Sequence, residues 1–450
     1  MKSLILNACV LTLCSAAAAD QLALDVSPVN KVLKAGEKQN TWMRVGLEGF
    51  KLDGEKKRPG VNLALVLDKS GSMQGDKIKK ARKAAIDAIN LLHPDDIVSI
   101  VTYDSTVNVL VPATKLTEKK DVIAKIRGIQ PGGNTALFAG VSKGAAEVRK
   151  FLNKERVNRV ILLSDGLANV GPSSPGELGS LGKSLTKENI TVSTLGLGLG
   201  YNEDLMVQLA STSGGNHLFI EKASELADIF RQEFDDVVSV VAQEVDIRIS
   251  IPEGIRPIRV LGNDSDITGQ NIVTRLSQIY SEQNRHVVIE LEVPPGEDAA
   301  KLDLATVVVT YANMKSHEED RLTAAASLTF SSDAAKVQKS INNKVLADVV
   351  VLESSERSKL ATKYLDEGNF AACRMCLEDN VKNLTINALK CPSENDKLSA
   401  LVRQNQWQLD QLQTATSNKD AAANRARKSF RGYQNEVDFQ QRAKGQSDKK

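Results

Sequence analysis

Apolar and amphipathic segments alternate along the chain between residues 61 and 240. Short runs rich in Val, Ile and Leu occur at residues 61–67, 97–103, 107–111, 159–163, 191–197 and 217–220. Apolar residues recur every three to four positions at residues 77–92, 121–127, 135–152, 177–187, 203–211 and 224–240. Apolar strands that alternate with helices predict a doubly wound, Rossmann-like α/β fold, with a mostly parallel sheet covered on both faces. The strand at 107–111 follows a three-residue turn, so we expect it to be antiparallel to its neighbour.

Residues 243–330 have a different pattern. Alternating or β-branched runs are separated by Pro and Gly, at residues 243–251, 255–261, 285–293 and 302–311. This pattern predicts an antiparallel β-sandwich. Two further strand-like runs, at 21–26 and 41–47, need partners, and the sandwich is the expected host. The α/β unit would then be inserted between strands of the sandwich.

The remaining chain is predicted to be helical and then disordered. Helical periodicity is found at residues 336–352, 356–366 and 399–414, and residues 365–373 resemble the turn of a single tetratricopeptide unit. After residue 417 the chain is basic and poor in apolar residues, which predicts disorder. The predicted organisation is a signal peptide (1–19), N-terminal strands of the sandwich (20–57), the α/β domain (58–240), the β-sandwich (241–330), a helical domain (331–416) and a basic tail (417–450).

The first residues have the layout of a secretory signal peptide. Lys2 precedes an apolar run at residues 4–13, and the A-x-A-like cleavage site Ala17-Ala18-Ala19 comes directly before Asp20. The run is too short to span a bilayer, and no transmembrane segment is predicted elsewhere. We therefore expect an exported protein, periplasmic or secreted. A lipoprotein attached through Cys14 is disfavoured, because Leu13 rather than a small residue precedes it.

Charge and composition exclude one class of partner. The formal net charge is only +2, acidic and basic residues are interspersed, and aromatic residues make up 4% of the chain. Nucleic-acid binding needs a basic surface or aromatic stacking platforms. No nucleic-acid partner is expected. The oligomeric state is left open.

Three cysteines remain after the predicted cleavage: Cys373, Cys376 and Cys391. In an oxidising compartment an odd number allows one internal disulfide at most. A redox-active C-x-x-C site would need a strand-to-helix turn that this pattern lacks. We expect a bridge from Cys391 to Cys376 or Cys373 that staples a helical hairpin.

Oxygen-bearing side chains follow two strands of the predicted parallel sheet and precede one of its helices. Asp68, Ser70 and Ser72 come directly after the strand at 61–67, and Asp165 follows the strand at 159–163. Thr135 opens a long helix after Gly132-Gly133-Asn134. Ligands bind such sheets beyond the carboxyl ends of the strands. An all-oxygen set at that edge suits a hard divalent cation, Mg²⁺ by preference.

These three segments together resemble the von Willebrand factor A domain and its metal-ion-dependent adhesion site. All five positions of the family's metal pattern are present: Asp68, Ser70, Ser72, Thr135 and Asp165. The resemblance covers about residues 58–240. The chain as a whole is similar to exported A-domain proteins of bacteria and, more distantly, to inter-alpha-trypsin inhibitor heavy chains.

The resemblance implies how the metal would be held. The hydroxyls of Ser70, Ser72 and Thr135 would bind the cation directly, whereas Asp68 and Asp165 would act through water or hydrogen bonds. Neutral hydroxyls leave much of the metal's charge unneutralised, so an open position would favour a carboxylate from outside. The implied function is non-enzymatic adhesion to a protein partner that presents Asp or Glu, with Mg²⁺, Mn²⁺ or Ca²⁺ as cofactor.

Two other functions are considered. An exported metal-dependent hydrolase would need a general base near the metal. The four histidines, His93, His217, His286 and His317, form no ligand-spaced pair, and each is interpreted as structural or exposed. The other alternative is a scaffold or chaperone-like envelope protein with a vestigial metal site.

Two features near the predicted site have open interpretations. Asn202-Glu203-Asp204 either caps the following helix or forms a rim that shapes partner choice. In the family, movement of the last helix, here at 224–240, is coupled to how the threonine binds the metal. Because this helix leads straight into the sandwich, we expect the sandwich to bias such a switch; the alternative is that it is a rigid spacer.

Overall fold

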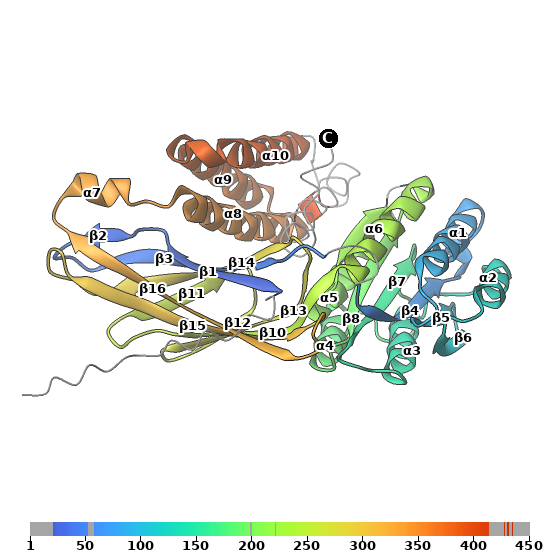
Figure 1. The fold of residues 1–450 in the computed structure, drawn as a ribbon. Coiled ribbons are helices and arrows are strands. Elements are labelled where there is room, and N and C mark those ends of the chain that lie inside the picture. Colours follow the sequence, from blue (N-terminus) through green and yellow to red (C-terminus); the bar gives the residue numbers. More distant parts are fainter. Residues whose placement is uncertain are drawn as a thin grey trace, which may run out of the picture.

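The computed structural model describes residues 21–52, 58–198, 200–220 and 222–413, together with Arg427, Phe430, Arg431 and Gln434. The predicted signal peptide and most of the predicted tail lie outside the described residues. Figure 1 shows an α/β unit, two antiparallel sheets beside it, and a group of helices that covers one of those sheets. No helix in the described parts of the chain is both long and apolar enough to cross a membrane.

A six-stranded sheet forms the centre of the α/β unit. Its strands are β4 (Gly60–Asp68), β5 (Ile97–Tyr103), β6 (Val107–Lys115), β7 (Arg156–Ser164), β8 (Thr191–Leu197) and β9 (His217–Ile220). They lie in the order β6-β5-β4-β7-β8-β9, and all pairs are parallel except β5 with β6. The central strands are buried on both faces, as their continuous apolar runs require. The predicted mostly parallel sheet is confirmed.

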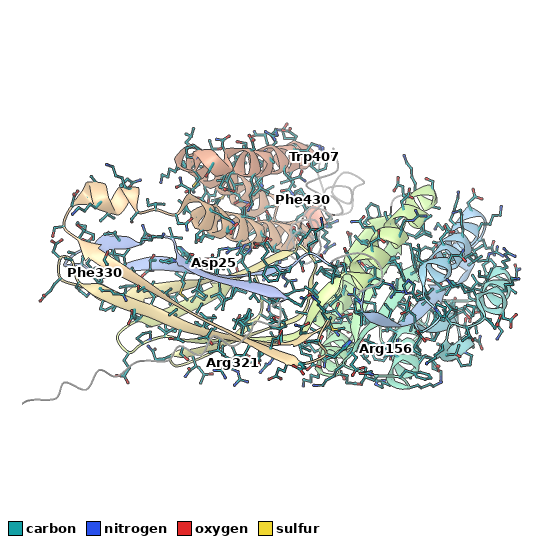
Figure 2. All side chains as sticks on the ribbon, viewed as in Figure 1. Asp25, Arg156, Arg321, Phe330, Trp407 and Phe430 are labelled. Carbon is teal, nitrogen blue, oxygen red and sulfur yellow. The ribbon has the colours of Figure 1, made fainter. Side chains whose placement is uncertain are left out.

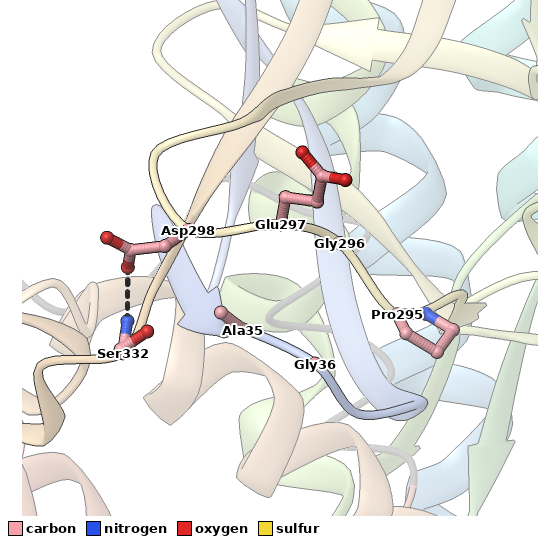
Figure 3. Close-up of a pocket in the computed structure, with 7 residues that line it drawn as sticks. All are labelled: Ala35, Gly36, Pro295, Gly296, Glu297, Asp298 and Ser332. Atoms are coloured by element: carbon pink, nitrogen blue, oxygen red, sulfur yellow. Dashed lines mark hydrogen bonds between the residues drawn. The ribbon is translucent and has the colours of Figure 1, made fainter.

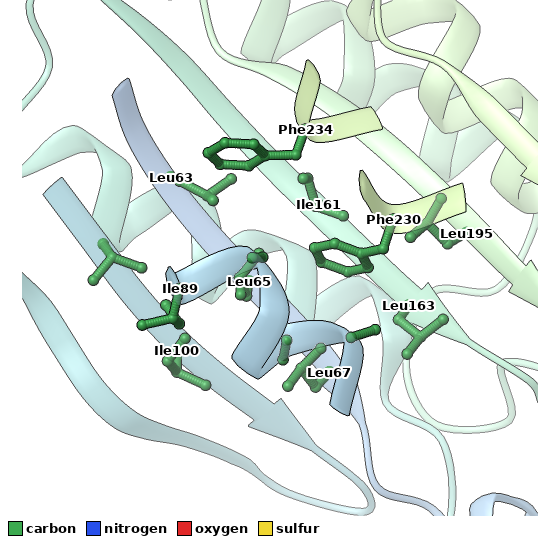
Figure 4. Packing of buried hydrophobic residues seen from close by; sticks show 14 of the residues in the cluster. Leu63, Leu65, Leu67, Ile89, Ile100, Ile161, Leu163, Leu195, Phe230 and Phe234 are labelled. Carbon is green, nitrogen blue, oxygen red and sulfur yellow. The ribbon is translucent and has the colours of Figure 1, made fainter. Parts of the chain in front are cut away.

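Helices cover both faces of this sheet. They are α1 (Asp76–Leu91), α2 (Lys119–Arg127), α3 (Leu137–Arg149), α4 (Pro175–Lys187), α5 (Glu203–Ser213) and α6 (Leu226–Val238), the last preceded by the 3-10 turn η3 (Ala223–Glu225). Successive side chains of β4 point to opposite faces. Leu63 and Leu65 pack with α1 and α6, whereas Ala64 and Val66 pack with α3 and its neighbours. Figure 4 shows Phe234 of α6 over the first of these cores.

Two sheets, antiparallel except for the parallel pairing of the edge strand β2 with β16, enclose a second hydrophobic core. The first has the order β1-β3-β14-β11, with β1 (Leu22–Pro28), β3 (Gln39–Gly49), β14 (Asn284–Val293) and β11 (Arg256–Leu261). The second has the order β12-β13-β10-β15-β16-β2, with β12 (Ser265–Thr268), β13 (Asn271–Tyr280), β10 (Val240–Ser250), β15 (Lys301–Asn313), β16 (Glu319–Ser331) and β2 (Val32–Lys34). Side chains of both sheets share one apolar cluster. β1 to β3 precede the α/β unit and β10 to β16 follow it, so the chain leaves this sandwich and returns to it.

Helices follow the sandwich, and α8 packs on its first sheet. They are α7 (Ala334–Lys339), which lies against β2 and β16 of the second sheet, and α8 (Asn343–Asp366), α9 (Phe370–Lys390) and α10 (Asn395–Gln413), with the 3-10 turn η4 (Pro392–Glu394) before the last. Val345 and Val349 of α8 pack on Leu261 and Val288 of the sheet. Phe430 is buried against the other end of α8 and α9 (Figure 2). The predicted break between helices at 352 and 356 is wrong, because α8 is continuous there.

The predicted disulfide is also wrong. Cys373, Cys376 and Cys391 are all free. Cys376 lies near the start of α9 and Cys391 caps its end, so about 22 Å of helix separates them at 1.5 Å per residue. A disulfide joins Cα atoms less than about 7 Å apart. The prediction assumed a hairpin in a segment that forms one helix. Burial raises the pKa of the Cys373 thiol to about 12, which makes it a poor nucleophile at neutral pH.

Candidate metal centre

The five predicted metal-site residues lie at the carboxyl edge of the parallel sheet. Asp68 is the last residue of β4, and Asp165 directly follows β7, the parallel neighbour of β4. Ser70 caps the 3-10 turn η2 (Gly71–Met73), which contains Ser72. Thr135 lies in the loop before α3, two residues earlier than the helix itself. Parallel strands end at the same edge, so the fold brings three distant segments together there.

Asp68 is buried and held by two hydrogen bonds. Its Oδ1 accepts from the backbone N–H of Ser70 at 2.8 Å, and its Oδ2 accepts from the Ser164 hydroxyl at 2.7 Å. Burial raises the pKa of the Asp68 carboxyl above its ordinary value. The bonds from Ser70 and Ser164 oppose that shift, and the charge of Asp165 adds to it. Asp68 therefore fixes the backbone of the serine loop.

Three hydroxyls and one carboxylate converge above Gly166. The Ser70 and Ser72 hydroxyl oxygens are 3.0 Å apart, and Ser72 donates to Asp165 Oδ1 at 2.7 Å. A Cβ atom added to Gly166 would lie 3.1 Å from Ser72 Oγ, 3.2 Å from Thr135 Oγ1 and 3.9 Å from Ser70 Oγ. The missing side chain of Gly166 therefore leaves a small space lined by hydroxyl oxygens from the other two segments.

Backbone hydrogen bonds hold the three segments in place. The N–H of Gly71 donates to Gly133 O at 2.9 Å, and that of Gly132 donates to Lys69 O at 2.7 Å. The N–H of Thr135 donates to Asn169 Oδ1 at 2.8 Å. Asn169 was not among the predicted site residues, although it follows Asp165 by four residues in the same loop. These bonds position Thr135 without using its hydroxyl.

Lys77 is a further charged group at the centre that the sequence analysis missed. It lies in the first turn of α1, and its Nζ is 2.5 Å from Asp165 Oδ2. The Asp165 side chain is completely buried, whereas that of Lys77 is 37% exposed. Both oxygens of Asp165 therefore have a partner, one from Ser72 and one from Lys77.

The donor set fits a hard cation. It consists of two carboxylates and three hydroxyls, and the described residues contain no group of three or more His, Cys, Asp and Glu side chains that could hold a metal ion. Hard cations such as Mg²⁺ take oxygen ligands and keep several waters, whereas softer metals prefer nitrogen or sulfur. The oxygen-lined space above Gly166 is compatible with this chemistry.

The histidines lie elsewhere. His93 and His317 are exposed. His217 is buried, with Nδ1 2.8 Å from Thr194 Oγ1 and Nε2 3.2 Å from Tyr201 OH, and burial lowers its pKa to about 3. His286 is buried against α8, where burial lowers its pKa to about 4. Their interpretation as structural or exposed residues agrees with these positions.

The contacts of residues 202–204 distinguish between the two interpretations of this segment. Asn202 caps α5, since its Oδ1 accepts from the N–H of Leu205 at 3.3 Å. Asp204, in the first turn, is 2.9 Å from Nη2 of Arg431, which also contacts Asp366 of α8. The capping interpretation of this segment agrees with the structure.

A surface pocket lies on the sandwich and includes none of the five predicted residues. Figure 3 shows that Asp298 Oδ1 accepts a hydrogen bond from the N–H of Ser332 at its edge. The pocket is open and is lined by Ala35, Gly36, Pro295, Gly296, Glu297, Asp298 and Ser332. One of its two acidic side chains, that of Asp298, is therefore already bonded to the backbone. The described residues that line the pocket form no group of side chains that could bind a ligand together.

A buried polar network joins the α/β unit to the sandwich. Arg159 of β7 and Glu233 of α6 form a completely buried ion pair at 2.7 Å. Nη1 of Arg159 makes this ion pair, and Nη2 donates to Gln278 Oε1 at 2.5 Å and to Tyr280 OH at 2.9 Å, both on β13. The helix α6 is therefore anchored to the sandwich as well as to its own sheet.

Comparisons with known proteins support the resemblance. The sequence pattern of the family described as von Willebrand factor type A domain matches residues 62–232. An uncharacterized protein of Synechocystis is 25% identical over 345 residues, which is 74% of this chain and 80% of that protein. Inter-alpha-trypsin inhibitor heavy chain H2 of mouse is 31% identical over 163 residues, which is 34% of this chain. The chain spans only 17% of that heavy chain.

The same fold is found among solved structures. A von Willebrand factor type A protein from Catenulispora acidiphila superposes with a TM-score of 0.68, over 90% of this chain and 91% of that one. The sequence identity is 16%, so this similarity concerns the fold. Because it covers nearly the whole chain, it extends beyond the α/β unit to the sandwich and the helices.

Proposed function

Residues 62–232 form a von Willebrand factor type A domain, and from this premise we propose that the chain is a non-enzymatic, Mg²⁺-dependent protein-binding module of the cell envelope. Such domains typically mediate protein interaction or adhesion and commonly bind a divalent metal. The observation that carries the proposal is the convergence of Ser70, Ser72, Thr135 and Asp165 above Gly166.

In the proposed centre, the hydroxyl ligands neutralise only a small part of the metal's positive charge. Ser70, Ser72 and Thr135 hold the cation through neutral hydroxyls, and Asp68 and Asp165 orient those hydroxyls or bound water. A bound dication supplies a strong electrostatic attraction for carboxylates. The partner is therefore a protein that presents Asp or Glu at the sheet edge. Mn²⁺ and Ca²⁺ are the alternative cations, since both accept oxygen ligands.

The proposal includes a location outside the cytoplasm. It rests on the sequence of residues 1–19, with its single charge, short apolar run and alanines. We place the mature protein in the periplasm or outside the cell. Mass spectrometry of its N-terminus after expression in a bacterial host tests this, because cleavage after Ala19 leaves Asp20 as the first residue.

The metal centre is tested with the double variant S70A/S72A. Calorimetric titration of the full chain should detect Mg²⁺ binding in the wild type and none in the variant. Ser72 is exposed and Ser70 is buried, and both side chains are small. Removal of the two hydroxyls should therefore leave the unfolding temperature within a few degrees of wild type. The matched control is S180A, a serine on the exposed face of α4. Unchanged Mg²⁺ affinity in S70A/S72A would refute the centre.

Partner binding is tested separately. Proteins captured from an envelope extract by the wild-type chain should be released by EDTA and should be missing from the S70A/S72A capture. Equal capture in both conditions would instead support the scaffold alternative. The Lys77–Asp165 ion pair gives that alternative some support, because it neutralises the centre without a metal. No histidine is found at the centre among the described residues, which disfavours the hydrolase alternative.

A further inference from the structure

The Asp165 carboxylate has no contact with solvent. Its side chain is completely buried, and a buried carboxylate is stable only with hydrogen bonds and an opposite charge nearby. Ser72 supplies a hydrogen bond to Oδ1. Among the described residues, the cation found within ion-pair distance of Asp165 is Lys77, at 2.5 Å from Oδ2.

The position of Lys77 connects three elements of the centre. Its side chain extends from the first turn of α1 to Asp165, the residue that directly follows β7. A Cβ atom added to Gly198, just after β8, would lie 3.9 Å from both Cε and Nζ of Lys77. The ammonium group therefore lies between the ends of β7 and β8, next to the oxygen-lined space. It remains partly exposed, so it can leave Asp165 without unfolding α1.

We propose that Lys77 is a built-in counter-cation that competes with the divalent metal for the candidate centre. This inference rests on the proposed function. Without metal, the ammonium group neutralises Asp165 and keeps the three loops folded. When a dication binds, it repels the ammonium and shares or takes over Asp165. Lys77 thus sets the metal affinity below the value that the five oxygen-bearing residues alone would give.

The side chain of lysine suits this role. Its charge is carried at the end of a flexible four-carbon chain and can move aside at little cost in backbone structure. A metal that binds under this competition is held less tightly, and the residual positive charge beside it adds to its attraction for a partner carboxylate. Lys77 is therefore a positioning residue for Asp165 and a determinant of metal affinity.

Titration of the metal-free full chain with Mg²⁺ alone tests the inference. We expect K77M to bind Mg²⁺ about tenfold more tightly than wild type, which corresponds to about 1.4 kcal/mol. The charge-conserving variant K77R and the control K79M should stay within about twofold. Lys79 is on the same helix, is exposed and forms an ion pair with the exposed Asp76. Equal or weaker Mg²⁺ binding by folded K77M would overturn the inference.

Thermal unfolding provides a second readout. In EDTA, K77M should melt at a lower temperature than wild type, because Asp165 has lost its cation. Added Mg²⁺ should then raise the unfolding temperature of K77M more than that of wild type. If K77M does not fold without metal, K77Q keeps a hydrogen-bond donor and permits the same comparison. The opposite order of the two Mg²⁺ shifts would also overturn the inference.

The two proposals fail in distinguishable ways. If S70A/S72A binds Mg²⁺ as the wild type does, the metal centre itself is wrong. If S70A/S72A loses Mg²⁺ while K77M and wild type bind it equally, the centre stands and only the role of Lys77 is wrong.

Discussion

Single residues decide whether the candidate centre has room for a cation, and Gly166 is the most direct case. Its backbone does not need the left-handed conformation, so alanine is tolerated there as far as the chain path is concerned. The added Cβ would nevertheless lie 3.1 Å from Ser72 Oγ and 3.2 Å from Thr135 Oγ1. That spacing is too tight for the hydroxyls to keep their places.

We therefore expect G166A to weaken Mg²⁺ binding at least tenfold while lowering the unfolding temperature by only a few degrees. Calorimetric titration measures the first effect and a thermal melt the second. G132A is the matched control, because a Cβ at Gly132 meets nothing within 4 Å although it lies in the neighbouring loop. Mg²⁺ binding that is unchanged in G166A would show that the cation does not occupy this space.

His286 makes stability depend on pH. Its ring lies near Asp348, Arg44, Lys397 and Arg285. Burial lowers its pKa to about 4; the positive charges of Arg44, Lys397 and Arg285 add to this shift, and the charge of Asp348 opposes it. An unfolded histidine has a pKa near 6.5. Between these values the unfolded chain binds a proton that the folded chain does not, so stability falls as the pH falls from about 6.5 to about 4.

The expected loss from His286 is about 3 kcal/mol over that range. H286N should therefore show a flatter dependence of unfolding free energy on pH. Urea unfolding at pH 4.5 and 7 measures the difference, and H317N, at an exposed position, is the control. A wild-type pH slope in H286N would mean that the ring is protonated in the folded state.

At the scale of elements, β7 and α6 are joined by the buried Arg159–Glu233 pair. Removing one partner of a buried ion pair leaves an uncompensated charge and costs about 3–5 kcal/mol. We expect E233Q to lose that much unfolding free energy in urea. The exposed pair Arg149–Glu188 is the control, and E188Q should lose no more than about 1 kcal/mol. Similar losses in both variants would show that Glu233 is not essential to the network.

Some elements were not predicted from the sequence, and each omission has a physical reason. β16 contains three consecutive alanines, and alanine is a weak strand former. The exposed positions of β13 are polar, so the sequence pattern did not distinguish this strand from the loops on either side of it. Both are stabilised by pairing, β16 with β15 and β13 with β10. In α8, the polar Glu353–Ser355 stretch suggested a break, but Ser354 and Ser355 are buried, and the Ser354 hydroxyl accepts a hydrogen bond from Asn380 of α9.

At the scale of the whole molecule, the three parts are connected through buried polar groups. Arg159 links the type A domain to β13, and Asp348 of α8 accepts from Arg44 of β3 and from Lys397 of α10. The helix α6 runs directly into β10, with Ser239 alone between them. A shift of α6 relative to the sandwich would break the network around Arg159.

These links favour a rigid arrangement over a helix switch. We expect Mg²⁺ to slow amide hydrogen exchange in the loops around Ser72 and Thr135 and to leave that of α6 unchanged. Exchange measured by mass spectrometry with Mg²⁺ and with EDTA provides the comparison, and S70A/S72A is the control that should not respond. A clear Mg²⁺ effect on the α6 amides would support the switch interpretation instead.

The sequence by itself determined the α/β fold, the strand ends and the five oxygen-bearing residues predicted for the metal centre. The reason is that the spacing of apolar residues in strands and helices, and the identity of the residues that follow a strand, are local features of the chain. Only the tertiary structure decided that Lys77 pairs with Asp165, that Asn169 positions Thr135, and that Arg159 reaches the sandwich. It also separated Cys376 from Cys391 along one helix. Each of these depends on packing between segments far apart in the chain, or on where a helix ends. Periodicity specifies neither of these.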